Sequence, residues 1–370
     1  MQIEIYNMTV LNDKLNISLE AVCDSFSSLL WDIEYYKCGA FEVYIAASPR
    51  NIEIFQTGRI VGRDDDKEHF GLIESVKLET DAEDGDYLII KGRFLMCLLE
   101  RRIIYPTFNF TKFVSYSQII MNVVQYNACT SGIRKIPGLV VGCSSGTCWN
   151  TKTKLQVSYE NLMEWIYTIC ERIGGTANIC LSKTNNEQYE MIFELSQGTD
   201  RSILQEINPH IIFSDRYNNL LSFTYFTDTS VKKNYAYVLG KGEGEKRKRT
   251  TYFEDSEPSS LDRYEVYVDA KEISDEEQVD NETKPLSEEE YAELLKEKGK
   301  QNIVPITMKS ESQIAVQSTQ FQYGVDYFVG DFVTVEHHRF GIRQNKIQLV
   351  GMIESFDRNG RNLTPTFKEE

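Results

Sequence analysis

The sequence predicts a mainly β protein with α+β parts, in which one small β-domain occurs twice. Three observations predict this class. Short runs of alternating apolar and polar residues, separated by turn residues, fill both ends of the chain. Tyr (21) and Phe (19) are abundant, and both favour strands. The phrase GLIES, which begins at Gly71, returns as GMIES at Gly351.

Residues 1–105 are predicted to form a first small β-barrel. At 370 residues the chain exceeds the roughly 250–300 residues at which single cores stop growing, so several domains are expected. Asp84 and Gly85 separate two alternating runs, which is a hairpin signal. The expected strands are 41–47, 52–63, 71–79 and 87–94.

Residues 106–206 are predicted to form an α+β connecting domain. One helix is expected from Ser115. A stronger one starts at Ser158 as N-cap, carries apolar residues at three- and four-residue spacing, and stops at Gly174 and Gly175. A strand is expected at 189–195.

A second β-barrel is predicted from two separate segments, 207–232 and 303–366. The insertion between them, 233–302, contains a hairpin loop, an acidic tract and a helix. Eleven acids and three lysines lie between residues 272 and 298, which indicates a solvated excursion. Ser287 and Glu290 form a capping-box pattern that starts the helix, with Gly299 as its stop.

The flanks of the repeated phrase favour a true duplication. In both places two alternating runs precede the phrase, a polar turn containing Gly85 or Gly360 follows it, and one more strand comes next. We therefore expect two related β-domains. The repeated residues are Gly71, Leu72, Ile73, Glu74 and Ser75 in the first copy, and Gly351, Met352, Ile353, Glu354 and Ser355 in the second.

Charge and composition argue against a nonspecific nucleic-acid-binding protein, a secreted protein and a membrane-spanning protein. The net charge of −16 disfavours nonspecific phosphate binding, which depends on Lys and Arg. The amino-terminal residues lack the apolar core of a signal peptide, and no run approaches the ~18 apolar residues of a membrane span. The eight cysteines contain no CxxC pair, so we expect reduced, structural thiols in a protein made in the cytoplasm.

Two patterns resemble catalytic or metal sites. GCSSG at 142–146 fits the nucleophile-elbow pattern with Ser144 as nucleophile, but the residues after it make a poor helix start. His337 and His338 are adjacent in a strand-like run, where successive side chains point to opposite faces. We expect no enzyme activity, no metal and no cofactor.

Two other segments are predicted to be structural or to serve assembly. The run GKGEGEKRKR fails both the dinucleotide and the P-loop patterns and is read as a hairpin tip. Its charged residues, Lys246, Arg247, Lys248 and Arg249, are either solvated or docked on an acidic neighbour, and could serve assembly. Gly330 and Asp331 are predicted to form a turn at a barrel rim.

Read end to end, the chain resembles the phage tail-hub or baseplate-hub proteins. The resemblance is to the siphovirus tail-protein family related to the amino-terminal part of tail-associated proteins. It rests on an ordered series of segments rather than one motif. Besides GLIES, the segments are 31–45, 92–104, 198–202, 211–220, 234–249, 263–270 and 323–335.

This resemblance implies two related barrels per chain and a homotrimer whose six barrels form a pseudo-six-fold ring. Such a hub would join a six-fold tail tube to a three-fold tip or baseplate, and DNA or a tape-measure protein would pass through its channel. The implied partners are a tail tube or distal tail protein, the tape-measure protein, and tip or spike proteins, with no membrane anchor. The implied location is the tip of the virion tail. The alternatives are a tail-tip hydrolase using Ser144 and a carbohydrate-binding adhesin, which the many aromatic residues favour.

Overall fold

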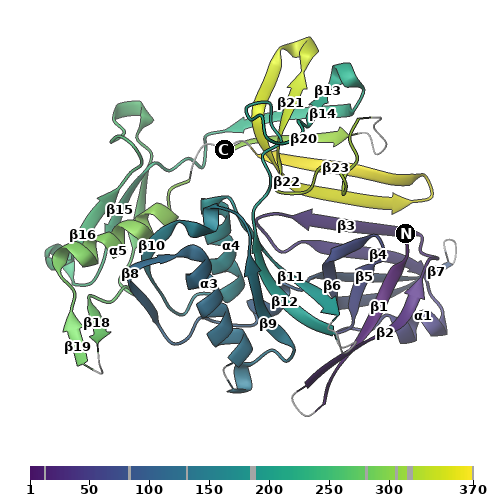
Figure 1. Cartoon of the computed structure of the whole chain (residues 1–370), viewed down its shortest axis with the longest axis horizontal. Helices are drawn as coiled ribbons and strands as arrows, with labels where there is room; N and C mark the ends of the chain where they lie inside the picture. The colour runs from purple at the N-terminus through teal and green to yellow at the C-terminus, as the bar shows by residue number, and fades with distance from the viewer. Residues whose placement is uncertain are drawn as a thin grey trace.

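The computed structural model describes residues 1–11, 14–81, 85–130, 132–183, 189–279, 282–304, 307–314 and 320–368. Figure 1 shows a β-rich part from each end of the chain, a helix-containing part beside them, and, on the far side of that part, an insertion at the left of the view. The strands β3 and β22, from opposite ends of the chain, lie side by side.

The first repeat is the amino-terminal sheet, with strand order β3-β4-β7-β6-β5-β1-β2. Alternate residues of β3 and β4, such as Leu29, Trp31 and Val43, point into the core. Residues 52–54 were expected in a strand, but they end a helix that Ser48 caps and Pro49 starts. The elements are β1 (Ile3–Leu11), β2 (Lys14–Cys23), β3 (Ser28–Glu34), β4 (Ala40–Ala46), α1 (Pro49–Ile54), β5 (Ile60–Arg63), β6 (Asp66–Asp81) and β7 (Gly85–Phe94).

The second repeat has the order β14-β20-β23-β22-β21-β13. Position for position this matches β3-β4-β7-β6-β5-β1 of the first repeat, and the matched strands also follow one another in the same order along the chain. The two repeats differ in that β13 runs parallel to β21, whereas β1 runs antiparallel to β5, and in that the first repeat also contains α1 and β2. The strands are β13 (Ile212–Ser214), β14 (Leu220–Asp228), β20 (Thr307–Ile314), β21 (Phe332–His337), β22 (Ile342–Asp357) and β23 (Gly360–Lys368).

The two repeats form one open sheet of 13 strands, and among the described residues neither closes into a barrel. Strand β22 pairs antiparallel with β3, from Gly351 opposite Glu34 to Phe356 opposite Leu29. Two separate closed barrels were expected. In the first repeat, β3 pairs with β4 on one edge and with β22 of the other repeat on its second edge, so β3 cannot close its own sheet.

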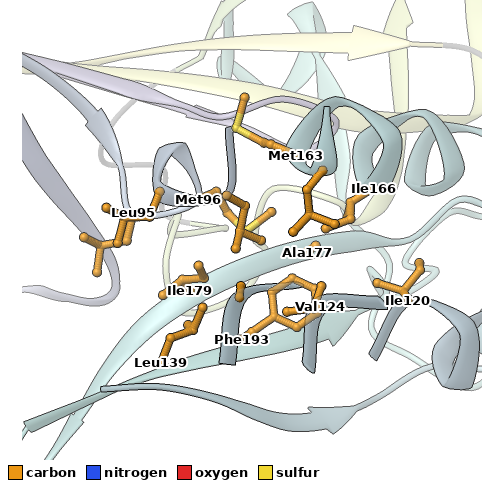
Figure 2. Close-up of a cluster of buried hydrophobic side chains, with 14 of the residues drawn as sticks. Leu95, Met96, Ile120, Val124, Leu139, Met163, Ile166, Ala177, Ile179 and Phe193 are labelled. Carbon is orange, nitrogen blue, oxygen red and sulfur yellow. The ribbon is translucent and has the colours of Figure 1, made fainter. Parts of the chain in front are cut away.

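The connecting domain shares its core with the first repeat. Helices α3 and α4 and the sheet β11-β12-β9 pack around Leu95 and Met96, which follow β7 (Figure 2). Helix α4 starts three residues later than expected, because Asn161 rather than Ser158 accepts from the first free N–H groups; Gly174 ends it as expected. The elements are α2 (Cys97–Glu100), β8 (Phe108–Ser115), α3 (Tyr116–Val124), β9 (Leu139–Ser144), β10 (Lys152–Val157), α4 (Leu162–Ile173), β11 (Thr176–Lys183) and β12 (Tyr189–Ser196).

The insertion has a small core of its own, in which α5 packs on the sheet β16-β15-β17. Ser287 and Glu290 form the expected capping box. Gly299 was expected to stop the helix, but the helix continues to Gln301, and the missing side chain lets α5 approach Val238 closely. The elements are β15 (Tyr235–Leu239), β16 (Arg249–Tyr252), β17 (Glu265–Asp269), β18 (Glu276–Val279), β19 (Glu282–Pro285) and α5 (Glu288–Gln301). In the described part of the chain no helix has the length and apolarity that crossing a bilayer requires.

Candidate assembly site at the junction of the two repeats

The two copies of the repeated phrase lie in matching strands. GLIES is in β6 and GMIES is in β22, and both strands are 16 residues long. In each case the phrase lies where the strand leaves its preceding partner and continues along its following one. Each phrase glutamate is held by an arginine of the following strand, Glu74 by Arg93 and Glu354 by Arg361.

The surroundings of the two copies differ. Strand β3 covers the second phrase, and the Glu354 side chain is 3% exposed. No strand of the described chain covers the same edge of β6 beyond Ile73, and the Glu74 side chain is 31% exposed. One copy of the phrase therefore lies at a completed junction, whereas the other pairs with β5 through Leu72 and reaches an edge that no described strand covers at Glu74.

A buried arginine fastens the completed junction. Arg63, at the end of β5, donates from Nη1 to Glu354 Oε1 at 3.0 Å across the two repeats. It also binds both oxygens of Asp65, at 2.9 and 3.0 Å. Its guanidinium lies 4.8 Å from the centre of the Phe356 ring and 5.5 Å from that of Trp31. Burial alone would lower the pKa of Arg63, but these two carboxylates raise it, so the guanidinium stays charged.

A second polar cluster, formed by Asp66 and His69, bonds Trp31 of β3. The Trp31 indole N–H donates to Asp66 Oδ2 at 3.0 Å, and His69 Nδ1 lies 2.9 Å from the same oxygen. Burial alone would raise the pKa of Asp66, but the His69 ring and nearby backbone N–H groups lower it below its ordinary value. Burial opposes the charged form of His69, yet Asp66 raises the pKa of that imidazole. The two groups thus stabilise each other as an ion pair.

Gly330 and Asp331 lie where the two repeats meet the connecting domain. Gly330 has φ +102°, and a Cβ there would lie 2.2 Å from the Tyr35 ring. A Cβ on Gly198 would lie 1.8 Å from the Gly330 carbonyl oxygen, so the two backbones need both glycines. The Asp331 carboxylate accepts from the Thr199 N–H at 2.7 Å and the Phe328 N–H at 3.1 Å, and pairs with Arg201 at 2.9 Å.

The contact between Tyr35, Gly198 and Asp331 borders a cavity of about 280 Å³. The Tyr35 hydroxyl accepts from the Gly198 N–H at 2.9 Å, which joins the first repeat to the connecting domain. Tyr35 and Gly198 lie in two of the segments that carried the resemblance, 31–45 and 198–202, but neither residue was given a role. Their partners are distant in sequence, so no local pattern pointed to the contact. The observed contacts are structural, and they explain why a glycine followed by a carboxylate stands here.

Half of the predicted assembly loop is engaged within its own chain. Arg247 donates to the Gly240 and Leu239 carbonyls at 2.7 Å each and pairs with Asp269. Lys248 lies 3.6 Å from Asp275. Lys246 and Arg249 are exposed. The role of this loop in assembly stays a prediction.

Ser144 lies at the exposed end of β9, and the next regular element is a short 3-10 turn at 148–150. A nucleophile elbow requires a helix immediately after the serine. Within the described ranges Ser144 has no hydrogen bond to a histidine, and no three His, Cys, Asp or Glu side chains are placed to hold a metal. All three tryptophans are buried and none offers a sugar-stacking surface.

Comparison with known proteins gives one family and a shared fold. A model described as Siphovirus ReqiPepy6 Gp37-like protein matches residues 3–367. A tail protein from Neisseria meningitidis MC58 superposes with TM-score 0.57 at 14% identity, covering 100% of this chain and 97% of that one. The 43 kDa tail protein of prophage MuSo2 from Shewanella oneidensis gives 0.56 at 12% identity, covering 99% and 98%. Prophage tail protein gp18 from Listeria monocytogenes EGD-e gives a TM-score of 0.53 at 11% identity, covering 100% of this chain and 95% of that one.

No curated protein matches the sequence. Because the family model spans nearly the whole chain, this protein belongs to the Siphovirus ReqiPepy6 Gp37-like protein family.

Proposed function

We propose that this protein is the hub of a phage tail, a non-enzymatic structural component that joins the six-fold tail tube to a three-fold tip or baseplate. Its family and the tail proteins that share its fold support a structural tail component. The hub role is the further step. It places the protein in the virion tail, between a tube or distal tail protein and the tip or spike proteins.

The observation that carries the proposal is the duplication of one six-strand unit within one chain. The two units have the same strand order and are joined edge to edge through β3 and β22. Three such chains supply six similar units, which match a six-fold tube, while the chain itself repeats only three times. A homotrimer of this kind would match the six-fold tube on one side and the three-fold tip on the other, with a single kind of chain.

The charge of the chain suits a channel. At −16 per chain, three chains carry −48, so a ring of them would repel the phosphates of DNA rather than hold them. A tape-measure protein or DNA could therefore pass without binding. Placement of acidic side chains on the inner wall of the ring is part of the proposal.

Immunogold labelling of virions with antibodies against the purified protein tests this proposal. We expect gold at one end of the tail, opposite the head. Labelling along the whole tube, or at the head, would exclude a hub. In the same phage, Ser144→Ala should leave tail assembly and infectivity unchanged, whereas loss of infectivity with normal tails would favour a tail-tip hydrolase.

A further inference from the structure

We infer that a shallow groove beside the connecting domain binds an acidic segment of another tail protein. The groove lies between the chain that follows α2, the 3-10 turn Gly132–Arg134 and the chain that precedes α4. This inference rests on the proposed function for the source of the partner, and it names the chemistry that the partner must have. We call the site the arginine groove. It has a volume of about 510 Å³, and its walls include Arg101, Arg102, Tyr105, Ile133, Arg134 and Tyr159.

The arginines of the groove have no carboxylate partner among the residues placed by the structure. Arg102 donates from Nε to the Arg134 carbonyl at 2.7 Å and from Nη1 to the Arg101 carbonyl at 3.0 Å. Arg134 donates to the Tyr105 carbonyl and to the Asn127 carboxamide oxygen, at 3.0 Å each. Burial and the two neighbouring arginines lower the pKa of Arg102. A carboxylate bound in the groove would therefore relieve the repulsion between three like charges.

The aromatic and apolar wall of the groove is held open to solvent by its backbone. Tyr159 has φ +57°, a left-handed conformation that residues other than glycine seldom adopt. Its N–H donates to the Ile104 carbonyl at 2.8 Å, and the Ile104 N–H donates to the Glu160 carbonyl at 2.9 Å. The Tyr159 ring is 69% exposed and lies 6.0 Å from the ring of Tyr105, which is 55% exposed. Together with the fully exposed Ile133, these rings form an uncovered apolar surface next to the arginines.

This combination of side chains fits a protein segment better than a nucleic acid. Arginine and tyrosine are enriched among the residues that dominate binding in protein interfaces. The planar guanidinium can bind both oxygens of a carboxylate, and Ile133 and the tyrosine rings can cover an apolar side chain beside it. DNA would bring many phosphates towards a chain whose net charge is −16. The expected partner is therefore a short segment in which Asp or Glu stands next to an apolar or aromatic residue.

The acidic helix of a second copy of this chain fits the groove less well. Glu288 and Glu289 in the first turn of α5 are exposed, but the apolar side chains of this helix pack into the core of its own insertion. The helix thus offers carboxylates without an exposed apolar side chain, and the wall formed by Ile133 and Tyr159 would stay uncovered. For this reason we assign the groove to a different tail protein.

An array of peptides that tile the other tail proteins of the same phage, probed with the purified full-length chain, tests the inference. Peptides of this chain and a thymidine oligonucleotide are included on the array. Arg101→Glu reverses one charge of the groove at an exposed position. Tyr159→Asn removes the ring and keeps a residue type that tolerates left-handed backbone. Arg50→Glu is the matched control, because it makes the same change of charge at an exposed position of α1, in the first repeat.

We expect the wild-type chain and Arg50→Glu to bind the same acidic tail peptides. In fluorescence anisotropy with those peptides, Arg101→Glu and Tyr159→Asn should each bind at least about tenfold more weakly. Replacing the carboxylate residue of a bound peptide by Arg should abolish binding to the wild-type chain and restore binding to Arg101→Glu.

Several results would overturn the inference. They are an array without any bound acidic tail peptide, equal weakening by Arg50→Glu, and binding that depends on Arg101 but selects the oligonucleotide or the peptides of this chain. Immunogold labelling away from the tail end would remove the hub role, whereas acidic tail peptides that still require Arg101 would uphold the arginine groove.

Discussion

Removing the Arg63 side chain should separate the two repeats more effectively than any exposed substitution. Arg63→Ala takes away the guanidinium that bonds Glu354 across the junction and packs against the Phe356 ring. It leaves Glu354 buried with Arg361 as its remaining ion-pair partner, and that arginine is 28% exposed. The perturbation therefore acts on the contact between β3 and β22.

The expected loss in the free energy of unfolding follows from the burial of the Arg63–Glu354 ion pair. Removing one partner of a buried ion pair costs about 3–5 kcal/mol, because the other charge is left uncompensated. Arg361 still neutralises Glu354 in part, so we expect a cost near the lower end, about 3 kcal/mol. Arg93→Ala is the matched control, since Arg93 binds the corresponding phrase glutamate but is 34% exposed. Its removal should cost at most about 1 kcal/mol.

Hydrogen exchange followed by mass spectrometry measures this difference locally. A loss of about 3 kcal/mol in opening free energy accelerates exchange roughly a hundredfold, and we expect this in peptides that cover β3 and β22. Peptides from α5 in the insertion should keep their wild-type rates, because that helix belongs to a separate core. Equal acceleration by Arg63→Ala and Arg93→Ala would refute the view that Arg63 fastens the junction.

Three further predictions concern other contacts. His69 is stabilised in its charged form by Asp66, so its contribution is fully present below about pH 6.5 and is lost as pH rises through its higher folded-state pKa. Thermal midpoints of wild type and His69→Gln should therefore differ most at low pH, and a gap that widens with rising pH would contradict the pairing. Gly198→Ala should lower the free energy of unfolding, measured with urea, by about 3 kcal/mol, because its Cβ would meet a backbone carbonyl oxygen. Gly58→Ala, with open space around the new Cβ, should cost about 1 kcal/mol through its positive φ alone. Equal costs for the two variants would refute the clash at Gly198. Ser287→Ala should cost the insertion helix about 1 kcal/mol and speed exchange in α5 alone; unchanged α5 exchange would show that the cap does not hold this helix.

Local signals in the sequence predicted local structure well. The Ser287–Glu290 capping box and the Gly174 helix stop stand where their patterns placed them, because their partners lie within a few residues. The start of α4 was predicted wrongly, because two residues close in sequence can each serve as the N-cap. Asn161 caps α4 in preference to Ser158, and its carboxamide oxygen accepts from two backbone N–H groups, at 3.1 and 3.3 Å.

Long-range features were beyond sequence reasoning. Arg63 and Glu354 are 291 positions apart, and no periodicity or spacing links them. The open sheet replaced the expected barrels for the same reason, since whether an edge pairs with its own repeat or with the other is decided by tertiary contact. The repeated phrase indicated two related units, but it did not indicate that one copy would be covered and the other left at an edge.

Electron microscopy of the purified full-length protein, carried far enough to trace strands, tests the central claim most directly. The account predicts a three-fold ring of six similar β-units, with GLIES and GMIES at matching places in their units. Strands β3 and β22 should be paired inside each chain. A particle whose two repeats take unrelated positions, or in which β3 and β22 are not paired inside each chain, would contradict it.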